Sequence, residues 1–472
     1  MKHATFTGRL VILGFGSIGQ GVLPLILRHI EIARERITIV TAEPRGREVA
    51  EEYGIRFIEQ AATRENFSSL LSPLLGPGDF LVNLSVDVSS VELMTLCQAR
   101  DVLYLDTVVE PWAGGYTDPS LTPSERSNYA MREAAIALRE RARGGPTAIT
   151  AHGANPGLVS HFVKRALLDI ARDTGAPIAS PPPDADRAAW AAIAERLGIK
   201  VIHIAERDTQ VSLTPKRRGE FVNTWSVDGF VGEGSQPCEL GWGTHERHFP
   251  ADGHRHGFGC DAAIYLLRPG ASTRVRSWTP LEGAYHGFLI THNESISLAD
   301  YYTVRNADGS VRYRPTAHYA YHPCDAAVLS IHELAGNNWQ MQPETRLMTD
   351  EITSGMDELG VLLMGHAKGA YWYGSRLTIE EARQLAPHNT ATSLQVTAGV
   401  LAGVVWAIEN PRRGVVESDE MDHARILEIA GPYLGEMAGV YSDWTPLQDR
   451  GRLFPEEVDA ADPWQFRNFR VT

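Results

Sequence analysis

Acidic side chains beyond about residue 200 have the type and grouping that would bind an amine. An ammonium group held between carboxylates and the face of an indole gains both ion pairing and a cation–π contact. His292 could move protons near neutral pH, where an ordinary imidazole titrates. A surface charge, a capped turn or a core histidine is the simpler interpretation for each residue alone, but the set suits an amine substrate. The residues are Glu206, Asp208, Trp225, Glu233, Glu239, His292, Glu294 and Asp357.

A glycine-rich segment near the start of the chain, RLVILGFGSIGQG, predicts a phosphate-binding turn between a buried strand (10–13) and a helix ending near residue 29. Its first glycine permits a tight turn, its second lets the backbone approach a pyrophosphate, and its third lets the helix pack close to the strand. The free N–H groups at the start of the helix would face the phosphates. The candidate cofactor-binding residues here are Gly14, Gly16, Ser17, Ile18 and Gly19.

An acidic residue follows the next predicted strand, 37–41, where a carboxylate would bind the adenosine ribose hydroxyls. This residue is Glu43, and its charge would repel a 2′-phosphate, so NAD is favoured over NADP. Arg45 weakens this inference, because a nearby arginine could accommodate that phosphate.

Strands continue to alternate with helical segments up to about residue 151, which predicts a doubly wound parallel sheet. The expected strands are 37–41, 55–59, 80–84, 102–105 and 147–151, and the segment 123–143 is predicted to be one long helix. Ligands of such sheets bind beyond the carboxyl ends of the strands. Helix caps and turn residues also occur there, but the polar residues at two strand ends are candidates for the cofactor site: Ser85, Asp87, Asp106, Thr107 and Glu110.

A second polar loop, His152–Gly157, lies between the strand 147–151 and a predicted helix at 158–173. Asn155 precedes a proline and is therefore expected to be extended. Its amide could orient a nicotinamide or a substrate amine.

The sequence changes character from about residue 200, where strand-like runs are separated by loops rich in Gly, His and Pro. We expect a second, α+β domain with a large, mainly antiparallel sheet. The apolar segment 392–409 is predicted to be a buried helix. The predicted division is a Rossmann domain of residues 1–151 with about 390–429 returning to it, a substrate and dimerisation domain of 152–389, and a C-terminal segment of 430–472 that wraps over the surface.

The composition of this 472-residue chain limits its partners. A net charge of −14 and the lack of a basic stripe argue against nucleic acid. An acidic cleft would attract a cationic substrate, although solubility is the simpler explanation of the acidity. No apolar run is long enough to predict a membrane span. Four scattered cysteines favour a reduced, cytoplasmic setting, and the spacing of His245, His248, His254 and His256 matches no usual metal site.

Several of these segments together resemble the bacterial homospermidine synthase family, part of the saccharopine dehydrogenase-like proteins. The resemblance spans nearly the whole chain and rests on the glycine turn with the following LPLI, on HGANPGLVS at 152–160 and on NTWS at 223–226. It implies a homodimer with a Rossmann domain and bound NAD. The implied reaction moves an aminobutyl group from putrescine or spermidine to putrescine through imine intermediates, and the hydride taken at the start is returned at the end.

The resemblance also implies roles for individual residues. Trp225 would stabilise cationic imines, and Glu206 or Glu233 would hold an ammonium group. His292 with Asn155 would orient the reacting amine or move protons, and Asp357 would line the pocket. Asp87 and Glu110 would lie nearer the entrance and the cofactor. The usual ribose-binding aspartate is replaced by Glu43.

Two other functions remain open from the sequence. A saccharopine- or carboxynorspermidine-type condensing dehydrogenase would need an arginine clamp for a substrate carboxylate. Arg207 and the run Lys216–Arg218 could supply one, although a charged surface turn is the simpler interpretation. An NAD-binding sensor without catalysis is the third possibility, and it predicts a ligand site with few convergent acidic groups in the second domain.

Overall fold

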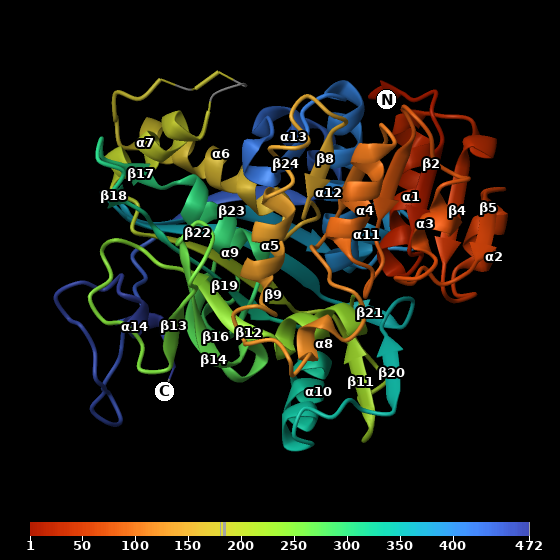
Figure 1. Ribbon diagram of the computed structural model, residues 1–472. Helices are drawn as coiled ribbons and strands as arrows, with labels where there is room; N and C mark the ends of the chain where they lie inside the picture. The colour runs from red at the N-terminus through yellow and green to blue at the C-terminus, as the bar shows by residue number, and fades with distance from the viewer. Residues whose placement is uncertain (180, 183–185, 472) are drawn as a thin grey trace.

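The computed structural model describes residues 1–179, 181–182 and 186–471. Its N-terminal part is built on a parallel sheet, as the alternation of strands and helices predicts. The strands in spatial order are β24 (Val415–Glu417), β8 (Ala148–Thr150), β7 (Leu103–Asp106), β6 (Phe80–Asn83), β2 (Leu10–Leu13), β4 (Ile37–Thr41) and β5 (Arg56–Glu59). The edge strand β24 comes from far along the chain and lies beside β8 (Figure 1).

The second part is built on a large, mainly antiparallel sheet, in which only the β9–β19 pairing is parallel among the described strands. This confirms the predicted fold class. The path is β13 (Gly253–Arg255), β14 (Ala263–Pro269), β12 (Pro237–Gly241), β19 (Thr316–His322), β9 (Val201–Asp208), β22 (Met356–His366), β23 (Gly369–Thr378) and β25 (Glu436–Ser442), with β16 (Gly283–Ile290) on β19 and β15 (Arg274–Thr279) on β16.

Helices cover both sheets. They are α1 (Ser17–His29), α2 (Arg47–Glu52), α3 (Phe67–Leu71), α4 (Ser90–Ala99), α5 (Asn128–Ile136), α6 (Leu158–Asp173), α7 (Arg187–Leu197), α8 (Val227–Ser235), α9 (Asn293–Tyr301), α10 (Asp325–Gly336), α11 (Ile379–Leu385), α12 (Ala391–Glu409), α13 (His423–Ala430) and α14 (Phe466–Phe469). Short strand pairs complete the fold: β1 (Ala4–Thr5) with β3 (Ile30–Glu31), β10 (Val211–Ser212) with β21 (Ile352–Ser354), β11 (Glu220–Asn223) with β20 (Glu344–Leu347) and β17 (Val304–Arg305) with β18 (Val311–Tyr313).

Two elements differ from the sequence predictions. The helix expected at 123–143 is only α5, because Ser127 caps it by accepting a hydrogen bond from the Ala130 N–H at 3.2 Å. The first two N–H groups of the helix, on Asn128 and Tyr129, donate to the buried Glu239 carboxylate. The C-terminal segment does more than cover the surface, since β25 extends the large sheet and Phe469 is fully buried against it.

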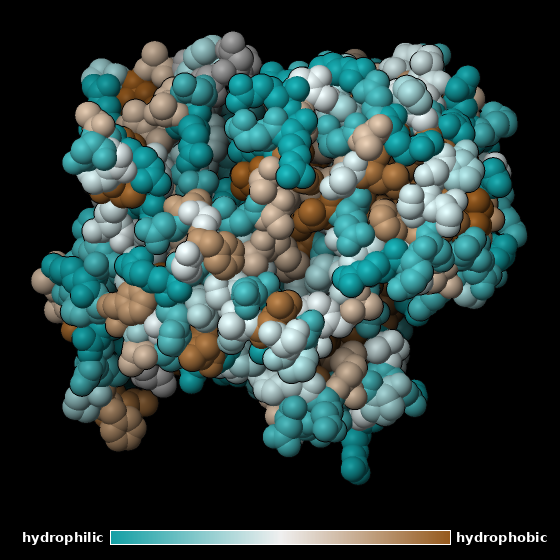
Figure 2. Space-filling model, viewed as in Figure 1, coloured by the Kyte–Doolittle hydropathy of each residue, from teal (hydrophilic) through white to brown (hydrophobic). Residues whose placement is uncertain are grey.

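Helix α12 packs tightly between the two sheets and holds the loop that follows β8. A Cβ added at Gly399 would lie 2.0 Å from the Gly153 carbonyl oxygen, so only glycine permits this approach. The helix is long and apolar enough to cross a membrane, but 89% of its apolar window is buried in the protein, which makes it a core helix. The face shown in Figure 2 is mostly hydrophilic, with apolar residues in small separate patches.

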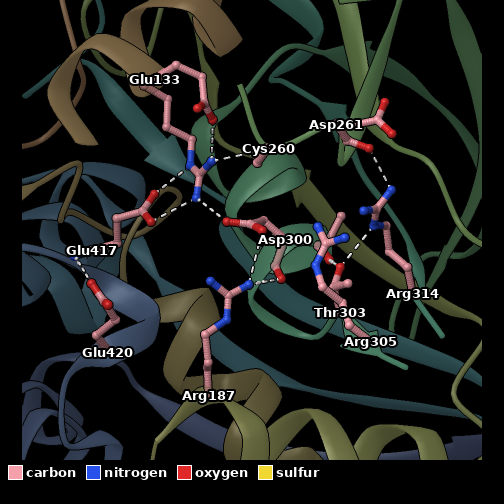
Figure 3. Close-up of polar contacts among 12 residues, drawn as sticks. Glu133, Arg187, Cys260, Asp261, Asp300, Thr303, Arg305, Arg314, Glu417 and Glu420 are labelled. Carbon is pink, nitrogen blue, oxygen red and sulfur yellow. Dashed lines mark hydrogen bonds and ion pairs between the residues drawn. The ribbon is translucent and has the colours of Figure 1, made fainter. Parts of the chain in front are cut away.

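A buried ionic network joins α5, the edge strand β24 and helix α9 (Figure 3). Arg132 is 1% exposed and donates both Nε–H and Nη2–H to the Glu417 carboxylate, at 2.6 and 2.8 Å. The same guanidinium contacts Asp300 at 3.0 Å and Glu133 at 2.9 Å. One cation therefore neutralises carboxylates from both parts of the chain.

We expect Arg132→Met to destabilise the protein strongly, because it removes the buried cation that Glu417 and Asp300 share and leaves them only the more exposed Arg139 and Arg187. Loss of one partner from a buried ion pair costs about 3–5 kcal/mol. The control is Arg139→Gln, since Arg139 also contacts Glu417 but is 28% exposed and should cost about 1 kcal/mol or less. Thermal and urea unfolding measure both variants, and equal losses would contradict this account of the network.

Candidate functional site

The glycine turn between β2 and α1 lines a cleft of about 2240 Å³ at the carboxyl ends of the parallel strands. Gly14 has a φ of +87°, and a Cβ there would lie 2.6 Å from the Ser85 nitrogen. A Cβ on Gly16 would meet no described protein atom within 4 Å, so that position opens toward the cleft. A Cβ on Gly19 would lie 2.8 Å from the Gly14 oxygen. These geometries match the requirements of a dinucleotide turn.

Other predicted cofactor residues divide into those that line this cleft and those that do not. Ser17, Ile18, Glu43, Ser85 and Asp87 are among the lining residues. The described residues that line the cleft do not include Asp106, Thr107, Glu110 or Asn155.

Asp106 has a structural role that the sequence did not indicate. Its carboxylate accepts hydrogen bonds from the Ala151 N–H at 2.6 Å and the Tyr104 hydroxyl at 2.8 Å. Burial raises the pKa of Asp106 to about 7. The Asp106 side chain thus secures the end of β8. Thr107 lies near the loop that follows β8, since a Cβ added at Gly153 would lie 3.6 Å from Thr107 Cγ2.

Three carboxylates lie on one face of the large sheet. Glu206 and Asp208 lie two residues apart on β9, and Asp357 on the neighbouring strand β22 lies directly opposite Asp208. Residues two apart on a strand share a face, so the three side chains converge. Their residues are at most 2% exposed, and none forms an ion pair within the described residues.

Burial is the main reason that these carboxyls hold their protons more tightly than usual. It raises the pKa of Glu206 to about 7, and it raises that of Asp357 well above the ordinary value, with the charges of Glu206 and Asp208 adding to it. The Asp208 carboxylate accepts from the Thr224 hydroxyl and the Gln210 N–H, at 2.6 and 2.8 Å. Both Asp357 oxygens lack a hydrogen bond from any described residue. Ammonium groups would supply the missing charge and donors.

Asn155 connects the parallel sheet with this carboxylate face. Its Nδ2–H donates to Glu206 Oε2 at 2.7 Å, and the Tyr319 hydroxyl donates to the same oxygen. The Asn155 loop follows β8, whereas Glu206 and Tyr319 belong to the large sheet. The loop therefore reaches the buried carboxylate face of the large sheet.

His292 lies between two carboxylates at the start of α9. Nε2 is 3.0 Å from Glu233 and Nδ1 is 3.1 Å from Glu294. Burial alone would lower its pKa, but the charges of Glu294 and Glu233 raise it well above the ordinary value. Each ring nitrogen thus faces a carboxylate oxygen, an arrangement that favours the protonated ring.

Trp225 begins a row of aromatic rings that leads to His292. Its Nε1–H donates to the Tyr321 hydroxyl at 3.0 Å. Tyr321 stacks on Tyr319 with ring centroids 5.5 Å apart, and Tyr319 lies 4.5 Å from the imidazole of His292. The alternating sequence Tyr-Ala-Tyr is typical of a strand with both tyrosines on one face, and it was the available signal for Tyr319 and Tyr321. The strand β19 that contains them was not predicted.

Further carboxylates extend the acidic surface from the pocket toward the cleft. Burial, then the charges of Glu233 and Asp87, raises the pKa of Glu110 to about 8. Burial, then the charge of Asp228, raises the pKa of Asp87. Asp87 and Asp228 line the cleft itself. Charge effects therefore extend from the buried Glu233 and Glu110 to acidic residues that line the cleft.

Several other candidates have structural partners instead. Glu239 holds the start of α5 and accepts from the Thr291 hydroxyl at 2.8 Å. Lys216 pairs with Glu333, and Arg207 lies 3.4 Å from both Glu282 and Asp325, so these cations form no clamp in the pocket.

The crowded histidines do not converge on one point. His248 pairs with Asp459, and His245 contacts the Trp464 carbonyl oxygen. His256 stacks on Tyr129 and His254 on Tyr265.

Comparison with known proteins gives two adjoining family matches. Residues 10–149 match the saccharopine dehydrogenase NADP binding domain, and residues 153–442 match the saccharopine dehydrogenase C-terminal domain. The homospermidine synthase of Blastochloris viridis is 56% identical over 98% of this chain and 97% of its own length. That of Mesorhizobium japonicum is 53% identical over 99% and 97%.

Solved structures agree with these relatives. The homospermidine synthase of Legionella pneumophila in complex with NAD superimposes with a TM-score of 0.92 at 51% identity, covering 99% of this chain and 98% of that one. The saccharopine dehydrogenase of Saccharomyces cerevisiae shares the fold, with a TM-score of 0.53 at 9% identity over 92% of this chain and 100% of that one.

The glycine turn gives a test that separates ligand approach from folding. We expect Gly16→Ala to leave the unfolding temperature unchanged, because its Cβ meets no described protein atom. It should weaken NAD binding at least about tenfold, equivalent to about 1.4 kcal/mol. Gly14→Ala should instead lower the unfolding temperature, because its φ and the nearby Ser85 nitrogen exclude a side chain. Calorimetry of NAD binding checks both, and unchanged affinity in Gly16→Ala would contradict this role.

Proposed function

Because this chain belongs to the homospermidine synthase family, we propose that it makes homospermidine by NAD-dependent aminobutyl transfer. Two putrescine molecules would give homospermidine and ammonia, and spermidine with putrescine would give homospermidine and diaminopropane. The observation that carries this proposal for the chain itself is the buried face of Glu206, Asp208 and Asp357, which has no cation of its own in the described residues.

The overall reaction has no net oxidation or reduction. NAD supplies reversible hydride transfer, and the residues that would hold it are those of the glycine turn with Glu43 and Ser85. The protein must bind two diamines, keep the reacting carbon beside the cleft and exclude water, since water would convert an imine to an aldehyde. Glu206, His292 and Asp357 are each at most 5% exposed, which favours that exclusion.

Carboxylates of the pocket bind the ammonium groups and prepare one of them to react. An amine must lose a proton before it can give up a hydride, and a base works best when its pKa lies near the working pH. Glu206, with a pKa of about 7, has this property. Its ionised form would accept the reacting ammonium and take its proton. Glu233 and Asp357 would hold the other ammonium groups.

Trp225 stabilises the cationic imine through the face of its indole ring. The Tyr321 hydroxyl fixes the edge of that ring by accepting its N–H. A cation–π contact in a desolvated site contributes about 2 kcal/mol. His292, held as a cation by its two carboxylates, donates hydrogen bonds and keeps Glu233 in place. It would not serve as the base.

NAD is the proposed cofactor even though the N-terminal match is to an NADP binding domain. Glu43 lines the cleft, and its carboxylate would repel a 2′-phosphate. Arg45 lies 3.8 Å from Glu43, so its charge is partly compensated. We also propose a cytoplasmic homodimer and a division into two domains, in which β24 and α12 return to the first and β25 joins the C-terminal segment to the second.

The competing condensing dehydrogenase would bind a carboxylated amino acid. It has less support, because Arg207 and Lys216 pair with acidic side chains outside the pocket. Incubation with putrescine and a catalytic amount of NAD separates the two activities. Homospermidine and ammonia in excess of NAD, without net NADH, are expected. Accumulated NADH without a coupled product would contradict the transferase.

Replacement of Trp225 tests the proposed imine stabilisation. We expect Trp225→Ala to lower kcat/KM about 30-fold, the equivalent of about 2 kcal/mol, because the cation–π contact is lost. Trp225→Phe, which keeps an aromatic face, should lose less. Turnover is measured by mass spectrometry and NAD affinity by calorimetry. Equal losses of turnover and NAD binding would indicate a folding defect instead.

A further inference from the structure

Tyr319 contacts both charged centres of the pocket, although no role is assigned to it by the function proposed above. It is 3% exposed and lies in the middle of β19, between β9 and β16. Its hydroxyl donates to Glu206, and its ring faces His292 at 4.5 Å with an interplanar angle of 35°. A side chain in this position can affect substrate binding without touching the substrate.

The hydroxyl of Tyr319 acts on one particular oxygen of Glu206. Asn155 donates to that oxygen, Oε2, as well. No N–H or O–H group of the described residues outside the neighbouring carboxyls donates to Oε1, and the acidic groups that act on the Glu206 carboxyl are Asp208 and Asp357. Two donors on Oε2 fix the plane of the carboxylate, and they leave Oε1 as the acceptor for an incoming ammonium.

Two neighbouring rings restrict the position of the tyrosine ring. Tyr321 stacks on it with ring centroids 5.5 Å apart, and the imidazole of His292 lies 4.5 Å away. The protonated imidazole gains from contact with an aromatic face. Burial raises the pKa of the Tyr319 phenol well above its ordinary value, so the group stays a donor at any working pH.

We propose that Tyr319 is a positioning residue that fixes Glu206 in the orientation and charge state needed to receive the substrate ammonium. This inference rests on the proposed function of the pocket. The hydroxyl stabilises the ionised carboxylate, because a hydrogen bond to the charged form favours that form. It opposes the effect of burial on Glu206.

The test is the pH dependence of kcat/KM in Tyr319→Phe, which removes the hydroxyl and keeps the ring. Without its donor Glu206 ionises at higher pH, so the acidic limb of the profile should move upward by about one pH unit. Activity should be lost mainly at and below neutral pH and recover as the pH rises. Asn155→Ala, which removes the other donor to Oε2, should shift the limb in the same direction.

Tyr285→Phe is the matched control. Its hydroxyl donates to the backbone carbonyl of Glu206 at 3.0 Å and not to the carboxylate, so the limb should stay in place. Loss of activity in Tyr319→Phe at every pH without a shift of the limb would overturn the proposal. An equal shift in Tyr285→Phe would overturn it as well.

A second measurement separates this inference from the proposed reaction. Calorimetric titration of the NAD-free enzyme with putrescine at several pH values reports ammonium binding without turnover. The midpoint of that pH dependence should rise in Tyr319→Phe even if the product is not homospermidine. An unchanged midpoint would contradict the role of Tyr319, whereas absence of homospermidine from the wild-type enzyme would contradict the proposed function alone.

Discussion

The burial of several carboxylates in one pocket is the constraint on which the rest of the structure depends. A carboxylate moved into a low-dielectric interior is unstable unless it is paired, hydrogen-bonded or protonated. Glu206 and Asp208 are hydrogen-bonded, whereas Asp357 receives no hydrogen bond from the described residues. Burial raises the pKa of Glu206 and of Asp357, and a positive charge bound beside them would lower it again. A polyamine meets that need without any cation from the protein.

Such a pocket must be held in place by parts of the chain that do not take part in it. Asn155 comes from the parallel sheet and reaches Glu206 in the other sheet, so both sheets must keep a fixed relation. The contact of α12 with Gly153 secures one side of that loop. The Arg132 network joins the same two parts elsewhere (Figure 3). In the proposed reaction the hydride would pass between the cleft at the parallel sheet and the carboxylate face of the large sheet.

The sequence predicted local structure far better than it predicted side-chain partners. The bounds of β2, β4 and α6 follow directly from apolar runs and turn residues. Asp106 and Glu239 looked like site residues because of their type, and only tertiary contacts reveal that they hold backbone N–H groups. Tyr319 was missed for the complementary reason. Its role depends on pairing with β9, which is distant in sequence and leaves no local pattern.

His292 explains how the pocket holds so many acids in the absence of substrate. The imidazole lies between Glu233 and Glu294, and the mutual repulsion of these carboxylates is relieved by its charge. Its raised pKa follows from that arrangement. The carboxylates of Glu206 and Asp357, which do not contact this ring, then remain available to the substrate. The acidic groups therefore divide into Glu233 and Glu294, which contact a cation of the protein, and Glu206 and Asp357, which do not, and Tyr319 contacts both His292 and Glu206.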